Sequence, residues 1–346
     1  MIRELDFRVE VLRGGVPFKD LTFSPSTPPT VSGSAESEIA MMLQGVFLHD
    51  PAVDYLTDEL RPIVIENGVE TPAGVYRVTS CRSTTNAAGV TYDQLECSDR
   101  GVLLTWHKLE QRDFWAAGTP YDTVISHYLI EAGITRVSMV PSGHVLQSDR
   151  EDWDIGTPFL TIINDLLSEI NYSALWFDIR GTAILRPYAA PSAASITHTY
   201  GVGSEARLLM PQLAAQLDLF DRPNVIICIL ENPEYPEPLT ATSVNDTPSS
   251  SISTVRRGMR IPQVVKVDNI ASAAELQTYA DRLRDEAMQL SEYIDVESGV
   301  QPGHNIGDTV ALVGLEREGV YRELSWSFSL AAGSVMRHKL EKQVIL

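Results

Sequence analysis

Three carboxylates near the middle of the chain have the residue types and spacing that acid–base catalysis requires. Asp165 and Glu169 are four residues apart, which places both on one face of a predicted helix, and Asp178 follows shortly after. A glycosidase uses two carboxyl groups ~5 to 9 Å apart, one of which has a raised pKa. The face that carries Asp165 and Glu169 is not the apolar stripe of the helix, so we expect solvated carboxylates, which have no reason to shift their pKa. We interpret all three as structural or surface charges, and a peptidoglycan-degrading enzyme that uses them as acid and base is the alternative.

Other catalytic and ligand-binding patterns are missing from the sequence. It contains no Gly-x-Ser-x-Gly nucleophile motif, no phosphate-binding loop and no Cys-x-x-Cys pair. His304 lies in a turn before a strand, where a solvated or hydrogen-bonded histidine is the ordinary interpretation. Cys81 and Cys97 lie on two strand-like runs around a turn, so they could face each other across a hairpin, and we expect both to be reduced. We assign no catalytic residue, no cofactor and no metal site.

The chain is strongly acidic. It has 27 basic and 46 acidic side chains among 346 residues, which gives a formal net charge of −19. Proteins bind the phosphate backbone with Lys and Arg, so this chain is a poor candidate for nucleic-acid binding. No apolar run approaches the ~20 residues that span a bilayer, and the amino-terminal residues alternate like a strand rather than a signal peptide. We expect a globular protein without a membrane segment, made in the cytoplasm.

Two helices are predicted at residues 120–132 and 158–170, and each begins with the tripeptide Gly-Thr-Pro. Thr is a good N-cap and Pro is tolerated at the first helical position, so we expect Thr119 and Thr157 to cap these helices. Gly133 can supply the left-handed residue that ends the first helix. The repeated Gly-Thr-Pro is therefore a helix start used twice, not a duplicated catalytic element.

Most of the remaining chain has the residue pattern of β-strands. Apolar residues alternate over residues 5–11, residues 23–37 are rich enough in Pro, Ser and Thr to predict a loop, and residues 231–260 predict a second, longer loop. A long helix is predicted at residues 272–290. The fold class is α+β and mainly β, and we expect three domains: a first β domain at 1–100, an α/β insert with two helices and a hairpin at 101–200, and a second β domain with the long helix at 201–346.

The order of several motifs resembles the baseplate hub proteins of phage tails, the group that includes late-control protein D and the amino-terminal part of tail-associated lysins. Together the motifs cover most of residues 70–325. Five segments carry the resemblance: paired strands leading to a short segment (79–106), a first helix (118–134), a second helix with a hairpin ending in Arg-Pro (153–187), a loop similar to the family's Asp-Pro-Ser loop (243–261), and a helix, strand and Pro-Gly-x-x-x-Gly-Asp turn (273–312).

The resemblance implies two tube-protein-like β-barrel domains with the α/β insert between them. It also implies a homotrimeric ring, in which three chains mimic a six-fold tail tube. Such a protein is a non-enzymatic virion component of the tail tip or baseplate, made in the cytoplasm of the host bacterium. Its implied partners are a distal tail or tube protein above and a tip, spike or tape-measure protein below, and DNA passes through the lumen without specific binding. The related spike proteins of type VI secretion share this plan, so a tail-like injection particle also fits.

The loop at residues 239–260 and the outer edges of the β-rich domains are our candidates for an assembly interface. Three arginines form a basic island in this acidic chain, which favours an acidic neighbouring surface. A receptor- or carbohydrate-binding tail module is a further alternative, because Trp106, Trp115 and Trp153 read as exposed. The interface candidates are Asn245, Asp246, Pro248, Arg256, Arg257 and Arg260.

Overall fold

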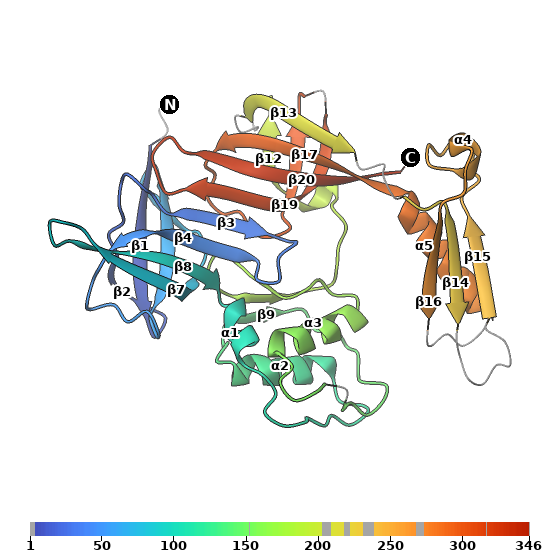
Figure 1. Cartoon of the computed structure of the whole chain (residues 1–346), viewed down its shortest axis with the longest axis horizontal. Coiled ribbons are helices and arrows are strands. Elements are labelled where there is room, and N and C mark those ends of the chain that lie inside the picture. Colours follow the sequence, from blue (N-terminus) through green and yellow to red (C-terminus); the bar gives the residue numbers. More distant parts are fainter. Residues whose placement is uncertain are drawn as a thin grey trace. The chain divides into compact units, whose positions relative to one another are not determined.

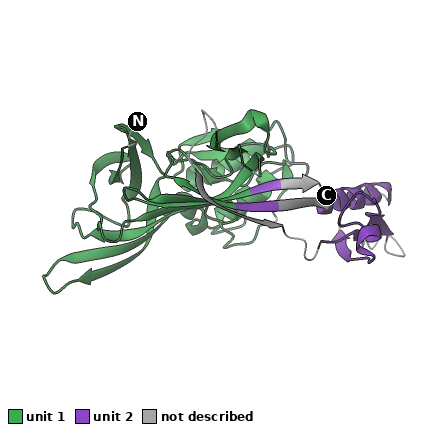
Figure 2. Cartoon of the chain, turned by 90° about the horizontal axis from the view of Figure 1, so that it is seen from above, with its two compact units in different colours: residues 1–213, 295–340 green, residues 214–294, 341–346 purple. Residues whose placement is uncertain are grey.

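The chain folds into two compact units, which Figure 2 distinguishes by colour. The first unit comprises residues 1–213 and 295–340, and the second comprises residues 214–294 and 341–346. Domain boundaries at residues 100 and 200 stay a prediction. The computed structural model describes residues 4–151, 153–202, 209–217, 222–230, 239–267, 273–315 and 317–345.

One large mixed sheet organises the first unit (Figure 1). Its strands follow the order β13–β17–β20–β19–β3–β4–β8–β7–β5–β1–β2, and β12, β18 and β6 pair beside this path. From the amino-terminal part come β1 (Leu5–Arg13), β2 (Val16–Asp20), β3 (Thr30–Ser34), β4 (Met41–Leu48), β5 (Glu59–Glu66), β6 (Val69–Pro72), β7 (Tyr76–Thr85) and β8 (Thr91–Asp99). From the carboxy-terminal part come β12 (Ile196–Gly201), β13 (Leu209–Leu217), β17 (Gln289–Gly299), β18 (Thr309–Val313), β19 (Gly319–Ser329) and β20 (Val335–Ile345).

Strands dominate the described residues, which confirms the prediction of a mainly β fold. Within the described ranges no sheet closes into a barrel, so the expected pair of β-barrel domains is not confirmed. The same ranges contain no helix long and apolar enough to cross a membrane.

The short strand β3 joins the amino-terminal and carboxy-terminal parts of the large sheet. It pairs antiparallel with β4 on one side and with β19 on the other. The prediction of a loop over residues 23–37 is therefore wrong for residues 30–34. Gly33 explains how a strand fits here, because a Cβ at this position would lie 2.7 Å from Cε2 of Trp326. The two parts of the sheet therefore share one hydrophobic core, in which Val31 and Leu43 pack with Trp326 and Met336.

The two cysteines of the β7–β8 hairpin do not face each other. Cys81 is opposite Leu95, and Cys97 is opposite Val78. Cys81 is exposed, Cys97 is buried, and both are free thiols. The hypothesis that they oppose each other across the hairpin is wrong, because Thr85 pairs with Thr91 at the turn, and Cys81 lies four residues from that pair whereas Cys97 lies six.

The segment predicted as an α/β insert (residues 101–200, called the insert below) packs its helices around one apolar core in the first unit. Ile125 and Leu129 of α2 meet Ile163 and Leu166 of α3, and Leu185 of β11 completes this core. Strand β11 pairs antiparallel with β10 and parallel with β9. The elements are α1 (Gly101–Trp106), α2 (Tyr121–Glu131), β9 (Val137–Met139), α3 (Phe159–Glu169), β10 (Trp176–Phe177), β11 (Ala183–Leu185) and the short 3-10 helix η1 (Ala193–Ser195).

The two predicted helices are confirmed to within a residue, but their predicted caps are wrong. Pro120 and Pro158 occupy the cap positions, and neither helix has a side-chain cap bond. The hydroxyl of Thr119 instead donates to the carbonyl oxygen of Ala116 at 2.8 Å. Gly133 has φ 77°, as expected of the left-handed residue that ends α2.

The second unit contains a small sheet with a helix on one face (Figure 1). Strand β14 lies between β15 and β16, and Leu276 and Ala280 of α5 pack on Ile226 and Cys228 of β14. Residues 239–244 and 254–257 are regular elements, so the predicted long loop is wrong there; residues 231–238 lie outside the described ranges. Helix α5 confirms the long helix predicted at 272–290 over residues 273–288; residues 289 and 290 begin β17 instead, and residue 272 is not described. The elements are β14 (Val225–Leu230), β15 (Leu239–Val244), α4 (Thr254–Arg257), β16 (Pro262–Val267) and α5 (Ala273–Met288).

Candidate functional site

The three candidate acids each hold a structural contact. The carboxylate of Asp165 accepts a hydrogen bond from Nε1 of Trp153 at 3.1 Å. Glu169 pairs with Arg150 at 2.8 Å and accepts a bond from the hydroxyl of Tyr121 at 2.6 Å. Both carboxylates are exposed on α3, as expected from the helix pattern.

Asp178 organises a turn rather than facing the other two acids. Its Oδ1 accepts the backbone N–H groups of Arg180 at 2.9 Å and Thr182 at 2.8 Å, and Gly181 sits in the same turn with φ 71°. These bonds shape the hairpin between β10 and β11. The structure therefore gives Asp178 a local role and shows no pairing with Asp165 or Glu169.

The expectation of three exposed tryptophans holds only for Trp106, which is 52% exposed. Trp115 is half-buried and donates to the hydroxyl of Tyr128 at 3.0 Å. Trp153 is buried, so its predicted exposure is wrong. Its ring packs in the core of the insert, and Arg150 stacks over it at 4.9 Å.

The candidate interface loop is anchored by one buried residue, Asn245. Its backbone N–H donates to the backbone carbonyl of Asn224, and its backbone carbonyl accepts from the backbone N–H of Thr254. Its side-chain amide donates to the hydroxyl of Ser250, and each of these three bonds is 2.9 Å long. These bonds leave Asn245 only 2% exposed, so it supports the loop from within.

The other interface candidates are exposed except for Arg257, which is half-buried and donates to the carbonyl of Arg222 at 3.2 Å. The short helix α4 presents Arg256, because the hydroxyl of Ser253 accepts its N–H at 3.3 Å and Gly258 ends the helix with φ 66°. The exposed candidates that face solvent are Asp246, Pro248, Arg256 and Arg260. Their role in assembly stays a proposal.

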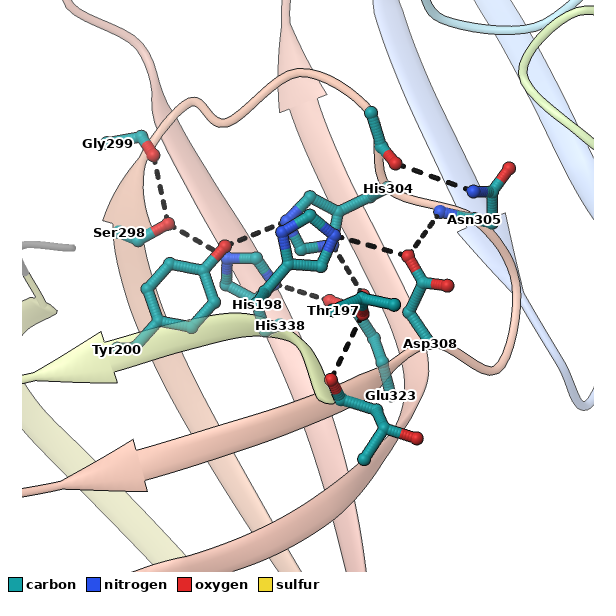
Figure 3. Close-up of polar contacts among 12 residues, drawn as sticks. Thr197, His198, Tyr200, Ser298, Gly299, His304, Asn305, Asp308, Glu323 and His338 are labelled. Carbon is teal, nitrogen blue, oxygen red and sulfur yellow. Dashed lines mark hydrogen bonds and ion pairs between the residues drawn. The ribbon is translucent and has the colours of Figure 1, made fainter. Parts of the chain in front are cut away.

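A buried network of titratable side chains lies in the first unit and connects β12, β17, β19 and β20 (Figure 3). Glu323 lies between two imidazoles: one carboxylate oxygen is 2.6 Å from Nδ1 of His304, and the other is 2.5 Å from Nδ1 of His338. The hydroxyl of Tyr200 is 2.8 Å from Nε2 of His304, and that of Ser298 is 2.9 Å from Nε2 of His338. All five residues are at most 3% exposed.

The network reaches toward the surface through His198. Its ring stacks on the ring of His304, with centroids 3.7 Å apart and planes 8° from parallel. Nε2 of His198 is 3.2 Å from a carboxylate oxygen of Asp308, which also accepts the N–H of Asn305 at 2.9 Å. A ring stack together with hydrogen bonds thus connects a half-buried histidine to the core (Figure 3).

The hydrogen bonds are satisfied when Glu323 is ionised and each flanking imidazole donates its Nδ1–H to the carboxylate. Burial alone would raise the pKa of Glu323, but His304 and His338 outweigh it and hold that pKa at about 2. Burial lowers the pKa of His304, more than the neighbouring carboxylate raises it. The arrangement stabilises a buried anion with two directed donors.

The contacts around Glu323 have hydrogen-bond rather than metal-ligand spacing. The candidate ligand atoms of His304, Glu323 and His338 lie within 4.8 Å of one another, as do those of His198, His304 and Asp308. Ligand atoms around a tetrahedral zinc ion are about 3.3 Å apart, because each bond is ~2.0 to 2.1 Å long. The contacts of 2.5 and 2.6 Å to Glu323 are shorter than that.

Sequence reasoning found one member of this network and missed the others. His304 was expected as a solvated or hydrogen-bonded turn residue, and it is hydrogen-bonded and buried. A signal for His338 exists, because Met336, His338 and Leu340 alternate on the buried face of β20. A histidine in phase with apolar residues on a strand indicates a buried partner, here Glu323.

Comparisons with solved structures match almost the whole chain. The tail protein from Neisseria meningitidis MC58 gives a TM-score of 0.66 at 15% identity, covering 98% of this chain and 98% of its own. The 43 kDa tail protein of prophage MuSo2 from Shewanella oneidensis also gives 0.66, at 10% identity, covering 97% of this chain and 98% of its own. The E. coli c3393 protein, a component of the type VI secretion system, gives 0.50 at 9% identity, covering 98% of this chain and 74% of its own.

The chain has the fold of phage tail proteins. This fold confirms the resemblance drawn from the order of the sequence motifs, including its extension to type VI secretion. No protein-family model matches the chain, and no curated protein matches its sequence. At identities this low the tail-protein fold is established by the path of the backbone, not by shared side chains.

Proposed function

We propose that this protein is a non-enzymatic hub of a phage tail tip or baseplate, or of a related injection particle. Three copies form a ring that joins the tail tube to a tip or spike. The tail-protein fold supports a structural role in a tail or baseplate. The observation that carries the ring is the eight-strand run β13–β17–β20–β19–β3–β4–β8–β7 within the large sheet.

This run is built from two equal halves. The carboxy-terminal part contributes β13, β17, β20 and β19, and the amino-terminal part contributes β3, β4, β8 and β7. One chain therefore supplies two four-strand segments side by side, joined by the pairing of β19 with β3. Three such chains give six similar segments, which matches the symmetry of a six-fold tube placed on a three-fold ring.

The two ends of the run are unlike, which suits a head-to-tail contact between copies. At one end, β5 pairs with β7 only at Tyr76 and Arg77, so among the described residues the outer edge of β7 from Ser80 to Thr85 has no strand beside it. At the other end lies β13. An open edge exposes unpaired backbone groups, and pairing the β7 edge of one copy with the β13 edge of the next removes both edges. Repetition of this heterologous contact closes a ring.

Charge supports the passage of DNA through such a ring without binding. The chain carries a formal net charge of −19. An acidic lumen repels the phosphate backbone, so the DNA does not adhere to the wall. The exposed arginines of α4 and the following loop, Arg256 and Arg260, are then suited to an acidic partner surface outside the lumen.

A proline at the open edge of β7 tests the ring. The N–H of Asn86 donates to Val90 across the hairpin at 2.9 Å, so the N–H groups of even-numbered residues face β8 and that of Cys81 faces outward. Cys81→Pro removes one outward donor and leaves the β7–β8 ladder intact, because proline is tolerated on edge strands. We expect the purified parent chain to be a trimer by native mass spectrometry and Cys81→Pro to be a monomer.

Cys81→Ser is the matched control, because it changes the same side chain and keeps the N–H; it should remain trimeric. Circular dichroism should be the same for both variants. Particle imaging provides the independent test, with three copies expected on the tail axis. Six copies, or a position away from the axis, would contradict the proposed function.

A further inference from the structure

A cavity of about 280 Å³ in the first unit has no role in the proposed ring. Its walls come from the turn between β3 and β4, from β10 and residues 186–191 of the insert, and from the turn before β18. Cavities near this size hold ligands about as large as a monosaccharide or disaccharide. All its lining residues belong to the same compact unit.

Arg322 places its guanidinium at the wall of this cavity. It is half-buried, it lines the cavity wall, and within the described structure it has no hydrogen-bond or ion-pair partner. Side chains alternate along β19, so Arg322 faces the cavity while its neighbour Glu323 faces the buried histidine network. Gly307, with φ 71°, lies beside the guanidinium, and a Cβ there would be 3.6 Å from Nε of Arg322. A guanidinium that is partly desolvated and unpaired is a site for an anion.

The opposite wall supplies a second cation and an aromatic surface. Arg186 stacks over the indole of Trp176, with its guanidinium carbon 4.9 Å from the ring centroid, and it too has no ion-pair partner among the described residues. The ring of Tyr188 is 45% exposed at the same wall. An exposed aromatic face suits the C–H groups of a sugar ring, and a planar guanidinium suits a carboxylate.

Two acids balance the two arginines and narrow the choice of anion. Glu38 and Asp308 also line the cavity, so its charged side chains sum to no net charge. Two guanidiniums beside two carboxylates leave no excess positive charge for the second charge of a dianion such as phosphate, whereas a monoanion can pair with Arg322 alone. Hydroxyl groups on the ligand can donate to Glu38, which has no partner of its own in the described structure.

We propose that this cavity binds an acidic sugar, with Arg322 recognising its carboxylate and Glu38 accepting from its hydroxyl groups. Arg186 and Tyr188 form the wall on which the sugar ring rests. The hub would thereby contact an acidic saccharide in addition to its structural role. A peptide carboxyl terminus offers the same anion without the adjacent hydroxyl groups, so the cavity favours the sugar.

Ligand binding to the full chain tests this proposal, with D-glucuronate as the acidic sugar, D-glucose as its neutral match and an N-acetyl dipeptide with a free carboxyl terminus. Binding is measured by saturation-transfer NMR and calorimetry. We expect glucuronate to bind and glucose to bind at least about tenfold more weakly, because a hydrogen bond to a charged group is lost. Arg322→Gln should weaken glucuronate binding by a similar factor, and Arg322→Lys should lie between the two.

Arg82→Gln is the control, because Arg82 is an exposed arginine on the β7 hairpin and does not line the cavity. Within the described residues Arg322 makes no hydrogen bond or ion pair that a substitution would break, so Arg322→Gln should unfold at the same urea concentration as the parent. Arg186→Gln gives a second test from the opposite wall and should also weaken binding. Equal affinity for glucuronate and glucose, unchanged binding by Arg322→Gln, tighter binding of the dipeptide, or no glucuronate binding at all would each overturn the proposal.

Discussion

Replacing Glu323 with Gln tests whether the buried network stabilises the fold through its charge. The pKa of Glu323 lies at about 2 in the folded chain, against an ordinary value of 4.5. A carboxyl whose folded-state pKa is lowered contributes stability that is fully present above its unfolded pKa and is lost as the pH falls toward the folded value. At ~1.36 kcal/mol per pKa unit, this contribution is about 3 kcal/mol at neutral pH.

Gln keeps the shape of the side chain but has no charge to lose in acid. Between about pH 5 and about pH 3.5, the wild-type chain should therefore lose about 1 kcal/mol more unfolding free energy than Glu323→Gln. Urea denaturation at these two pH values measures the difference, and hydrogen exchange of peptides from β18, β19 and β20 assigns the transition to this region. Glu297→Gln is the control. Glu297 forms an ion pair with Arg337 at 3.0 Å, and that arginine is largely exposed, so the pair is not buried as the Glu323 network is.

His304 adds a second acid-sensitive contribution at higher pH. Its pKa is lowered from 6.5 by burial, so the unfolded chain binds that proton more readily and stability falls as the pH drops below about 6.5. Because Glu323 itself raises the pKa of His304, Glu323→Gln also changes this loss, and the same comparison in a His304→Gln background separates the two effects. The reasoning is refuted if wild type and variant lose the same free energy between about pH 5 and about pH 3.5, because Glu323 would then titrate alike in the folded and unfolded chains.

Two further outcomes follow from the packing of the large sheet. Gly33→Val should lower the unfolding free energy by about 1 to 3 kcal/mol in urea denaturation, because the new side chain overlaps Trp326. Ser32→Val on the same strand should not lower it. Equal effects of the two substitutions would contradict this account. Iodoacetamide should label exposed Cys81 well before Cys97, because the thiol of Cys97 is buried and burial raises its pKa to about 12. Mass spectrometry measures the two labelling rates. Equal rates in the native chain would refute the assigned burial.

Local sequence patterns predicted the helices because their signals are contained within a few turns. The apolar stripe on residues 158–170 and the glycine at position 133 depend only on neighbours along the chain. The predicted threonine caps failed because each proline took the cap position itself. Strand β3 was missed for the opposite reason: its Ser and Gly residues have little strand propensity, and pairing with β4 and β19 supplies the stability.

The candidate sites show the same division. The solvated character of Asp165 and Glu169 followed from their position off the apolar stripe, and the structure confirms that they are exposed. The placement of Trp153 did not follow, because its burial depends on the core of the insert and on the carboxylate of Asp165. Arg322 gave no sequence signal, because lack of a partner is a property of the surrounding walls.

The sequence by itself determined the acidic charge, the mainly β composition, the helices at residues 121–131 and 159–169 and the order of motifs that resembles phage tail hubs. These properties are sums or short-range patterns, so they do not depend on how distant segments meet. Only the tertiary structure decided that β19 pairs with β3 and that His304, Glu323 and His338 form one buried network. Such contacts join residues far apart in the chain, and their stability comes from burial and hydrogen bonds that exist only after the sheet has formed.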